Sequence, residues 1–456
     1  MIGNLLDSPD KVLKLISDYL EPKHSEKKEF GEVFTPMDFV YDKQLKDIEI
    51  HWHKSRGEDI WTNEKLTWYE PTVGVGNYMI AVYYKLLEGL KYKIPNEADR
   101  KKHIIETQLY MGELNKSNCN IVKSIFNTND EYNLNLYEGD TLNIDLFNTF
   151  GVNTFDIIIG NPPYNEKVSA TQTCPRTLYT KYIEEYINKC KLLSYIIPSK
   201  WFSNNVRTDK FRVMMLNRTD IVYIRHYDDA TQIFSKGVDI NGGVNYFLID
   251  SSYNGLCNYN GVDIKLNAYD ILTDSKYYDL IDKLKSYEKV TKYYQGQHYY
   301  NIETNDKRVK DVQTADDYKC YMGKQKGFVK YIDKKVIKRK MNDYNVITTR
   351  SSHGSKSGFG NMFVGYPNEV YSDTYIAFTL NTKEEAESLY SYLKCKLPNL
   401  MLSLRKMSQH ISKPICEWIP LVPLNKQWTD NEIYAYFNLS EDNIKLIKET
   451  QISGYK

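Results

Sequence analysis

The chain has 456 residues, of which 41% are hydrophobic and 26% are charged, and its net charge is +1. This length predicts two or three domains with sizeable cores, and the composition excludes a chain that is disordered throughout. Seven scattered cysteines without a C-x-x-C pair argue against a disulfide framework and against a structural zinc site. Without a signal peptide or an apolar run of bilayer length, the sequence indicates a soluble, cytoplasmic protein with no membrane partner.

The first half of the chain predicts alternating strands and helices. Strands are expected at 65–70, 108–113, 134–137, 155–160, 192–197, 221–226 and 244–250, and helices at 78–87, 117–126, 178–190 and 210–216. The isoleucine run at 157–159 is typical of a strand that is buried on both faces. This alternation predicts an α/β fold with a doubly wound sheet, whose ligands bind beyond the carboxyl ends of the strands.

The alternation stops after residue 267. A helical connection is expected over Tyr269–Tyr293, and short strands, glycine-rich loops and helices without clear order are expected beyond Cys320. We therefore place a boundary near residue 270, which gives a first domain at 1–270 and a second, mixed α+β domain at 271–456.

An amide, two prolines and an aromatic ring stand directly after the strand 155–160, as Asn161, Pro162, Pro163 and Tyr164. Prolines remove backbone donors, so the carbonyls of this turn are available as acceptors, as is the side-chain carbonyl of Asn161. Together with the flat ring of Tyr164, these acceptors form a site for a planar group that carries an NH2. Methylation of such an exocyclic amine depends on hydrogen bonding and orientation, and needs neither a metal nor a strong base. A structural Pro-Pro turn is the alternative.

Acidic and glycine residues follow the first three expected strands. Gly74 and Gly76 allow a tight turn that approaches a ligand closely. Glu70 suits a cationic ligand, and S-adenosylmethionine carries an ammonium and a sulfonium. Glu113 ends the second strand, where a carboxylate can accept both hydroxyls of a ribose, and Asp140 can accept a hydrogen bond from an adenine amine. Taken alone, Glu113 is equally well explained as a solvent-exposed glutamate at the start of a helix, without a ribose contact. Asp140, taken alone, is explained as an ordinary turn residue.

Together, these motifs resemble the gamma-type N6-adenine DNA methyltransferases, in which the cofactor motif precedes the catalytic motif and a target-recognition domain follows. The resemblance covers most of residues 30–250 and includes Gly31–Pro36, which is similar to the family's N-terminal cofactor segment. It implies methyl transfer from S-adenosylmethionine to the N6 amine of a flipped adenine in duplex DNA. It also implies a Rossmann-like methyltransferase sheet in 1–270 and a target-recognition, DNA-binding domain in 271–456. In this family, asparagine in the first place of the tetrapeptide goes with adenine, while serine usually goes with cytosine N4.

The resemblance assigns roles residue by residue. Catalytic roles fall on Asn161, Pro162, Pro163 and Tyr164. Cofactor contacts fall on Phe34, Thr35, Pro36, Glu70, Gly74, Gly76, Asn77, Glu113, Asp140 and Asn161. No metal ligand is expected. The glycine motif commonly begins with Asp, so Glu70 departs from the family pattern and its detailed contact stays open.

Basic residues are concentrated in one stretch of the second half. Ten basic and two acidic residues lie between positions 321 and 360, so this stretch has a net charge of +8 in a chain of net charge +1. Such a concentration predicts a phosphate-binding face, with a solvated basic face as the alternative. The expected DNA contacts are Lys324, Lys326, Lys338, Arg339, Lys340, Arg350 and Lys356. The small-residue loop 351–360 and the stretch Arg405–Lys413 are further candidates.

The expected partner is duplex DNA, and a cognate restriction endonuclease encoded separately is a candidate second partner; a monomer is expected. Two alternatives remain open: an RNA or protein acceptor, and a modification subunit that needs a separate specificity protein. The same tetrapeptide occurs in methyltransferases of glutamine side chains and of ribosomal RNA, although those usually lack a large C-terminal domain. A fused nuclease is not expected, because only about 30 residues precede the cofactor segment.

Overall fold

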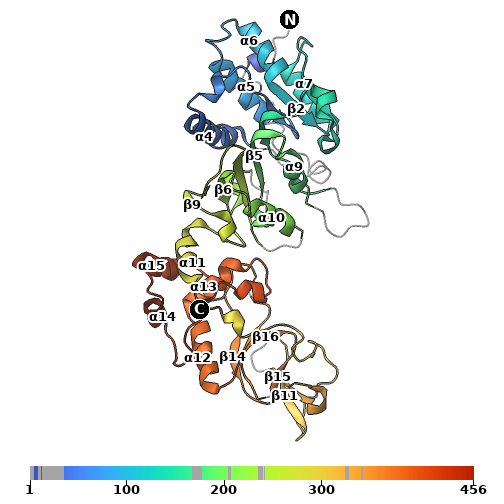
Figure 1. The fold of residues 1–456 in the computed structure, drawn as a ribbon. Helices are drawn as coiled ribbons and strands as arrows, with labels where there is room; N and C mark the ends of the chain where they lie inside the picture. The colour runs from blue at the N-terminus through green and yellow to red at the C-terminus, as the bar shows by residue number, and fades with distance from the viewer. Residues whose placement is uncertain are drawn as a thin grey trace. The chain divides into compact units, whose positions relative to one another are not determined.

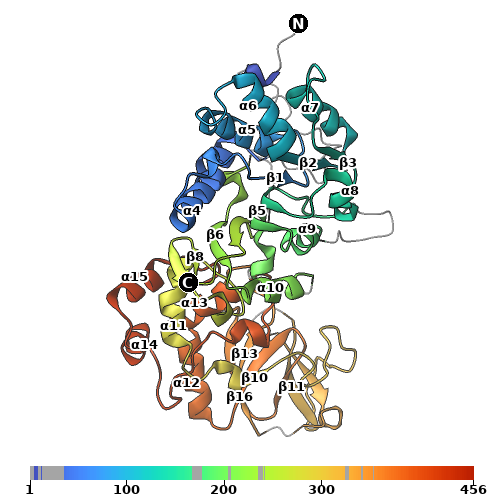
Figure 2. The ribbon, with the colours of Figure 1, turned by 45° about the horizontal axis from the view of Figure 1, so that its top comes forward.

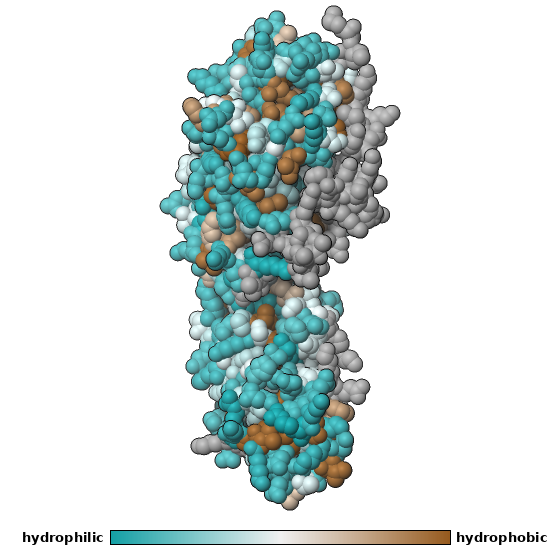
Figure 3. All heavy atoms as spheres, turned by 90° about the vertical axis from the view of Figure 1, so that its right-hand side faces the viewer, coloured by the Kyte–Doolittle hydropathy of each residue, from teal (hydrophilic) through white to brown (hydrophobic). Residues whose placement is uncertain are grey.

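The computed structural model describes residues 5–8, 12, 35–166, 177–203, 207–234, 240, 242–323, 328–339, 342–352 and 354–455. The chain divides into two compact units, Met1–Leu272 and Thr273–Lys456. The face shown in Figure 3 is mainly hydrophilic, with separate hydrophobic patches. Of the helices in the described ranges, none has both the length and the apolar character that crossing a bilayer requires.

A nine-stranded sheet forms the centre of the first unit, with the strand order β3-β2-β1-β4-β5-β7-β6-β8-β9 (Figures 1 and 2). Its strands are β1 (Trp68–Glu70), β2 (Leu109–Glu113), β3 (Leu136–Glu138), β4 (Phe155–Gly160), β5 (Cys190–Pro198), β6 (Ile221–Tyr227), β7 (Val244–Asp250), β8 (Cys257–Tyr259) and β9 (Val262–Ile264). The strands from β3 to β5 pair in parallel, whereas β7 is antiparallel to both β5 and β6. The first unit is therefore a mixed α/β fold with a parallel-rich sheet. The strand order reverses between β1 and β4, where such sheets open a crevice for ligands.

Both faces of this sheet are covered. On one face, Ile157 and Ile159 of β4 belong to the same core cluster as the buried side of α5 (Asn77–Gly89). On the other face, the ring of Tyr69 stacks on Phe155 at a centroid distance of 4.5 Å and meets Tyr186 edge-on at 5.5 Å. A strand covered on both faces needs apolar residues in succession, which explains the isoleucine run. The other α-helices among the described residues of this unit are α3 (Met37–Phe39), α4 (Lys46–Arg56), α6 (Glu97–His103), α7 (Lys116–Phe126), α8 (Leu146–Phe150), α9 (Tyr179–Tyr186) and α10 (Asp209–Leu216).

The helix expected at 178–190 is shorter in the structure, and the expectation is wrong at its end. The helix α9 stops at Tyr186, and Cys190 already begins β5. Cys190 lies opposite Phe155 in the parallel pairing of β4 and β5. Sheet pairing therefore overrides the local helical pattern at this point.

The second unit contains two small sheets and several helices. Its strands are β10 (Tyr294–Gln295), β11 (Asp317–Tyr321), β12 (Val329–Asp333), β13 (Tyr344–Thr349), β14 (Met362–Gly365), β15 (Glu369–Tyr371) and β16 (Tyr375–Leu380). They form an antiparallel sheet in the order β10-β16-β13-β14 and a mixed sheet in the order β12-β11-β15. Its α-helices are α11 (Tyr278–Leu284), α12 (Lys383–Leu393), α13 (Lys396–Arg405), α14 (Asp430–Tyr436) and α15 (Glu441–Glu449). One apolar cluster, which includes Cys320, Ile347 and Ala377, joins strands of both sheets.

The helical connection expected over Tyr269–Tyr293 is confirmed only in its middle. Only α11 is α-helical there, between single 3-10 turns at 275–277 and 290–292. The side chain of Asp274 accepts a hydrogen bond from the Lys276 amide, so it starts a turn inside the expected helix. Leu272 lies before that turn, and its amide donates to the carbonyl of Phe202 in the first unit.

A buried carboxylate connects α4 to the end of β7. Asp250 accepts hydrogen bonds from Nε2 of His51 at 2.7 Å, and from Nη1 and Nη2 of Arg56 at 3.0 and 3.2 Å. Burial alone would raise the pKa of Asp250, but the bonds from His51, Arg56 and Ser252 outweigh it and hold the pKa well below its usual value. Asp250, in its ionised form, thus fastens α4 to the end of an interior strand of the sheet.

Replacing Asp250 with asparagine is expected to lower the free energy of unfolding at pH 7 by about 2–3 kcal/mol, because it leaves the Arg56 guanidinium without its charge partner. Since the folded pKa is depressed, the stabilisation is complete above about pH 4 and is lost as the pH falls further. Urea unfolding at pH 7 measures the first effect, and its repetition between about pH 5 and pH 2 measures the second. The exposed Asp263→Asn is the control, and equal midpoints for the two variants would contradict the prediction.

Candidate functional site

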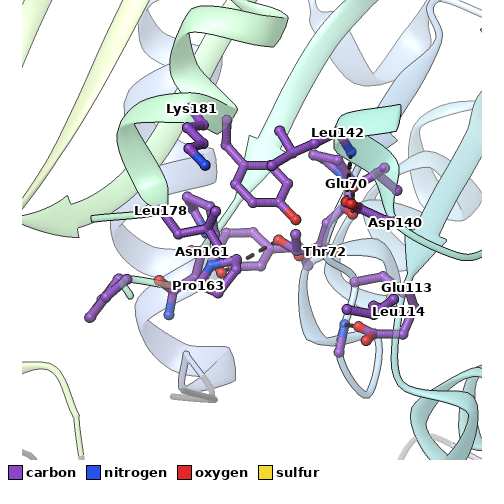
Figure 4. Close-up of a pocket in the computed structure, with 18 of the residues that line it drawn as sticks. Glu70, Thr72, Glu113, Leu114, Asp140, Leu142, Asn161, Pro163, Leu178 and Lys181 are labelled. Carbon is purple, nitrogen blue, oxygen red and sulfur yellow. Dashed lines mark hydrogen bonds between the residues drawn. The ribbon is translucent and has the colours of Figure 1, made fainter. Parts of the chain in front are cut away.

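A cavity of about 570 Å³ lies at the carboxyl end of the sheet in the first unit (Figure 4). Its described walls include the turn 70–75 after β1, the segment 161–166 after β4, and the start of α9. The sequence-predicted residues that it brings together are Thr35, Glu70, Gly74, Asn77, Glu113, Asp140, Asn161, Pro162, Pro163 and Tyr164. Pro36 and Gly76 are not among the described lining residues, and Phe34 lies outside the described residues.

The glycine turn holds its shape through positive φ angles and one carboxylate. Gly74 has φ of +55° and Gly76 has φ of +101°, which is where side chains other than glycine are strained. The amide of Gly74 donates to Oε2 of Glu113 at 2.8 Å, and the amide of Asn115 donates to Oε1 at 2.7 Å. Glu113 thus ties the end of β2 to the turn after β1, and it is buried.

A second carboxylate, Glu70, is buried beside the first. Its Oε2 has no hydrogen-bond partner among the described residues. Burial, together with the nearby charge of Glu113, raises the pKa of Glu70 well above its ordinary value. A Cβ at Gly160, where φ is +150°, would lie 3.2 Å from Oε1 of Glu70, so glycine at the end of β4 leaves room for this carboxylate. The cavity therefore offers a buried acid whose ionised form a cation would stabilise.

Thr35 connects the N-terminal segment to the residue after the glycine turn, Asn77, and to the first residue of the tetrapeptide, Asn161. Nδ2 of Asn77 donates to its carbonyl at 2.8 Å, and Nδ2 of Asn161 donates to its Oγ1 at 3.2 Å. The hydroxyl of Thr72 approaches the backbone carbonyl of Asn161 at 3.5 Å. The predicted Thr35, the glycine turn and the tetrapeptide thus meet at one point of the cavity.

Tyr164 is buried on the cavity wall, and its carbonyl accepts a hydrogen bond from the amide of Leu178 at 3.0 Å. Burial raises the pKa of its phenol, which therefore stays neutral. Its position beside Pro162 and Pro163 gives the tetrapeptide one flat aromatic side.

Asp140 is exposed, unlike the two glutamates. Its Oδ1 accepts the amide of Leu142 at 3.1 Å, and its Oδ2 accepts Nδ2 of Asn143 at 2.7 Å. These bonds cap the short 3-10 turn Thr141–Asn143. Asp140 therefore has a local structural task as well as a place on the cavity wall.

Sequence reasoning missed several residues that line the cavity. They are apolar Leu114, Leu142 and Leu178, and polar Glu166, Lys181 and Tyr182. Leu114 is 62% exposed. The sequence feature that could have indicated it is its position directly after Glu113, where a strand ends. Figure 4 shows Leu114 and Glu113 on one side of the cavity and Lys181 on the other.

The basic residues predicted for DNA belong to the second unit. Lys338, Arg339 and Lys356 are exposed and Arg350 is partly exposed. The guanidinium of Arg339 lies 4.3 Å from the ring centroid of Tyr299. Three further predicted contacts, Lys324, Lys326 and Lys340, lie outside the described residues.

The two further candidate stretches of the second unit lie against each other. Oγ of Ser351 is 2.9 Å from Nδ1 of His410. The ammonium of Lys406 is buried and donates to the hydroxyls of Ser352 and Ser357, and burial lowers the pKa of Lys406 to about 8. A lysine within a stretch singled out for DNA contact is thus inside the fold.

Comparison with known proteins relates part of this chain to a family. Residues 80–234 match the sequence model of the Eco57I restriction-modification methylase family. An uncharacterized adenine-specific methylase of Mycoplasma pneumoniae is 25% identical over 297 residues, which cover 49% of this chain and 68% of that protein. Both matches concern less than the whole chain.

Solved structures with a similar fold come from restriction-modification enzymes. The ATP-dependent type ISP enzyme LlaBIII bound to DNA has a TM-score of 0.52 at 13% identity, with 99% of this chain and 41% of that chain covered. The DrdV–DNA complex has a TM-score of 0.51 at 13% identity, with 90% of this chain and 58% of that chain covered. This chain thus spans between about two fifths and three fifths of those chains, and the likeness concerns the fold.

Proposed function

We propose that this protein transfers a methyl group from S-adenosylmethionine to the N6 amine of adenine in duplex DNA. The catalytic part is residues 1–270, a Rossmann-like, doubly wound methyltransferase sheet, and residues 271–456 form the target-recognition part. The observation that carries the proposal is the single cavity shared by the tetrapeptide 161–164, the glycine turn and the two buried glutamates. The family match of residues 80–234 and the name of the Mycoplasma relative support a methylase with adenine as its target.

The cavity fits S-adenosylmethionine in size and charge. Its volume of about 570 Å³ is within the range of small-molecule sites. Oε2 of Glu70 is a buried acceptor without a partner among the described residues, which suits a cationic ligand. The two oxygens of Glu113 offer about four acceptor positions, so its two backbone bonds are compatible with accepting ribose hydroxyls too. When bound, this cofactor supplies a methyl group on a sulfonium.

The other proposed cofactor contacts surround these two glutamates. Asp140 lies at the exposed rim, where its carboxylate is accessible to an adenine amine. The remaining contacts taken from the family pattern are Phe34, Thr35, Pro36, Gly74, Gly76, Asn77 and Asn161.

In this proposal, the tetrapeptide holds the target amine and makes its nitrogen more nucleophilic. The side-chain carbonyl of Asn161 and the backbone carbonyl of Pro162 accept the amine hydrogens, and the ring of Tyr164 packs on the base. These bonds draw the nitrogen toward tetrahedral geometry, which releases a lone pair otherwise delocalised into the base ring. The adenine leaves the duplex at a cost of a few kcal/mol, which contacts between the second unit and DNA phosphates offset.

The second unit supplies the DNA contacts in this proposal. They are Lys324, Lys326, Lys338, Arg339, Lys340, Arg350 and Lys356. A separately encoded cognate restriction endonuclease, a monomeric state and a cytoplasmic location complete the proposal.

The acceptor class is tested with methyl-labelled S-adenosylmethionine, offered to the full chain with unmethylated duplex DNA, with RNA, or with protein. We expect label only in duplex DNA. Label in RNA or protein would contradict the proposed acceptor. No label in any acceptor, with the cofactor bound, would point to a modification subunit that needs a separate specificity protein.

Binding of the cationic cofactor is expected to release a proton from Glu70. Because the pKa of Glu70 is raised in the ligand-free cavity, the carboxyl must ionise to pair with a cation, so affinity rises with pH up to that pKa. Glu70→Gln should lower the affinity about 10- to 100-fold and abolish this part of the proton release. Calorimetry in two buffers of different ionisation enthalpy measures the protons. Unchanged release in Glu70→Gln would show that another group titrates.

A further inference from the structure

The cavity of the first unit is strongly acidic. Its described lining includes four acidic side chains, Glu70, Glu113, Asp140 and Glu166, and one ammonium, that of Lys181. This charge suits a cationic cofactor, but it repels the phosphates of a nucleic acid. A nucleotide that brings its base to the tetrapeptide therefore needs a local cation.

Lys181 is the cation nearest to the tetrapeptide along the cavity wall that the structure describes. Its Nζ lies 2.5 Å from Oε1 of Glu166, two residues after Tyr164. The amide of Lys181 donates to the carbonyl of Leu178 at 2.9 Å, and the amide of Leu178 in turn donates to the carbonyl of Tyr164 at 3.0 Å. The helix that carries Lys181 is thus fastened directly to the last residue of the tetrapeptide.

The ion pair of Lys181 and Glu166 is weak enough for another anion to replace Glu166. Their side chains are 51% and 26% exposed, respectively. Pairs of this exposure contribute little stability and are screened by salt. Glu166 thus holds the ammonium at the cavity while no stronger anion is present.

We propose that Lys181 is a positioning residue for DNA, and that its ammonium leaves Glu166 to pair with a phosphate next to the nucleotide whose base enters the cavity. Glu166 then acts as a competitor for Lys181. This inference rests on the proposed function, because it takes duplex DNA as the substrate. It predicts opposite effects of removing the two partners, whereas a purely structural ion pair predicts similar losses for both.

The proposed role of Lys181 is tested by binding of a fluorescent duplex to the full chain in the presence of S-adenosylhomocysteine. The affinity is measured between about 50 and 250 mM NaCl, where exposed charges are increasingly screened. Lys181→Ala is expected to weaken DNA binding about five- to tenfold near 0.1 M salt and to lower the salt slope by about one. Lys181→Arg should keep the slope. Glu166→Gln should strengthen DNA binding about two- to fivefold.

The matched controls are Lys189→Ala and Glu185→Gln. Glu185 lies in the last turn of α9 and Lys189 follows the helix; the two form an ion pair that does not line the described cavity. Neither control should change the salt slope. Shifts in the same direction for Lys181→Ala and Glu166→Gln, or an unchanged slope, would overturn the inference. A loss of S-adenosylhomocysteine affinity in Lys181→Ala would also overturn it, because Lys181 would then hold the cofactor. If the unaltered protein neither binds nor methylates duplex DNA, the proposed function itself fails.

Discussion

Replacing Asn161 with alanine is expected to lower kcat for methyl transfer by about 10²–10³-fold, because it removes a preorganised acceptor for the target amine. The fold should tolerate this change. The side chain of Asn161 donates at 3.2 Å to Thr35 Oγ1, and one such bond contributes about 1 kcal/mol. Affinity for S-adenosylhomocysteine should therefore fall by less than about tenfold.

Single-turnover kinetics with labelled cofactor separate the chemical step from binding. Asn217→Ala is the matched control, because Asn217 is an exposed residue at the end of α10. A loss of cofactor binding equal to the loss of rate would contradict a role for Asn161 in holding the amine. Such a result would assign it to the cofactor instead.

Replacing Glu113 with glutamine is expected to weaken S-adenosylhomocysteine binding by about 10²–10³-fold. Hydrogen bonds from ribose hydroxyls to a charged acceptor are worth about 1.5–3 kcal/mol each, and both would be weakened. One carboxamide NH2 would also face a backbone amide, that of Gly74 or that of Asn115, both of which now donate to Glu113.

Isothermal titration measures this affinity, and thermal unfolding of the ligand-free protein measures the structural part. Glu138→Gln is the control, since Glu138 ends the neighbouring strand β3 and is exposed. A variant that unfolds at lower temperature and yet binds with unchanged affinity would restrict Glu113 to shaping the turn.

The strand positions could be predicted well where apolar runs are bounded by turn residues. The strands expected at 155–160 and 244–250 have those bounds in the structure, because each run is continuous and buried. The antiparallel placement of β7 between β5 and β6 could not be predicted, since pairing partners depend on contacts far apart in the sequence. For the same reason, Cys190 leaves the expected helix and joins the sheet.

The convergence of the strand-end residues could also be predicted, because parallel strands end at one edge of a sheet. The sequence did not indicate the two bonds that make Thr35 a connection between Asn77 and Asn161. It also gave no sign that Lys406 is buried, since lysine is ordinarily exposed and only the fold encloses this one. The roles of the site residues and of the basic residues in the second unit stay predictions until they are tested.

The central claim is the identity of the methylated atom, and nucleoside analysis tests it most directly. Unmethylated duplex DNA is incubated with the purified full chain and S-adenosylmethionine carrying a labelled methyl group, then digested and separated. We predict that the label is found in N6-methyladenine, and that Asn161→Ala slows its appearance by about 10²–10³-fold. Label in N4-methylcytosine, or in no nucleoside of DNA, would contradict the claim.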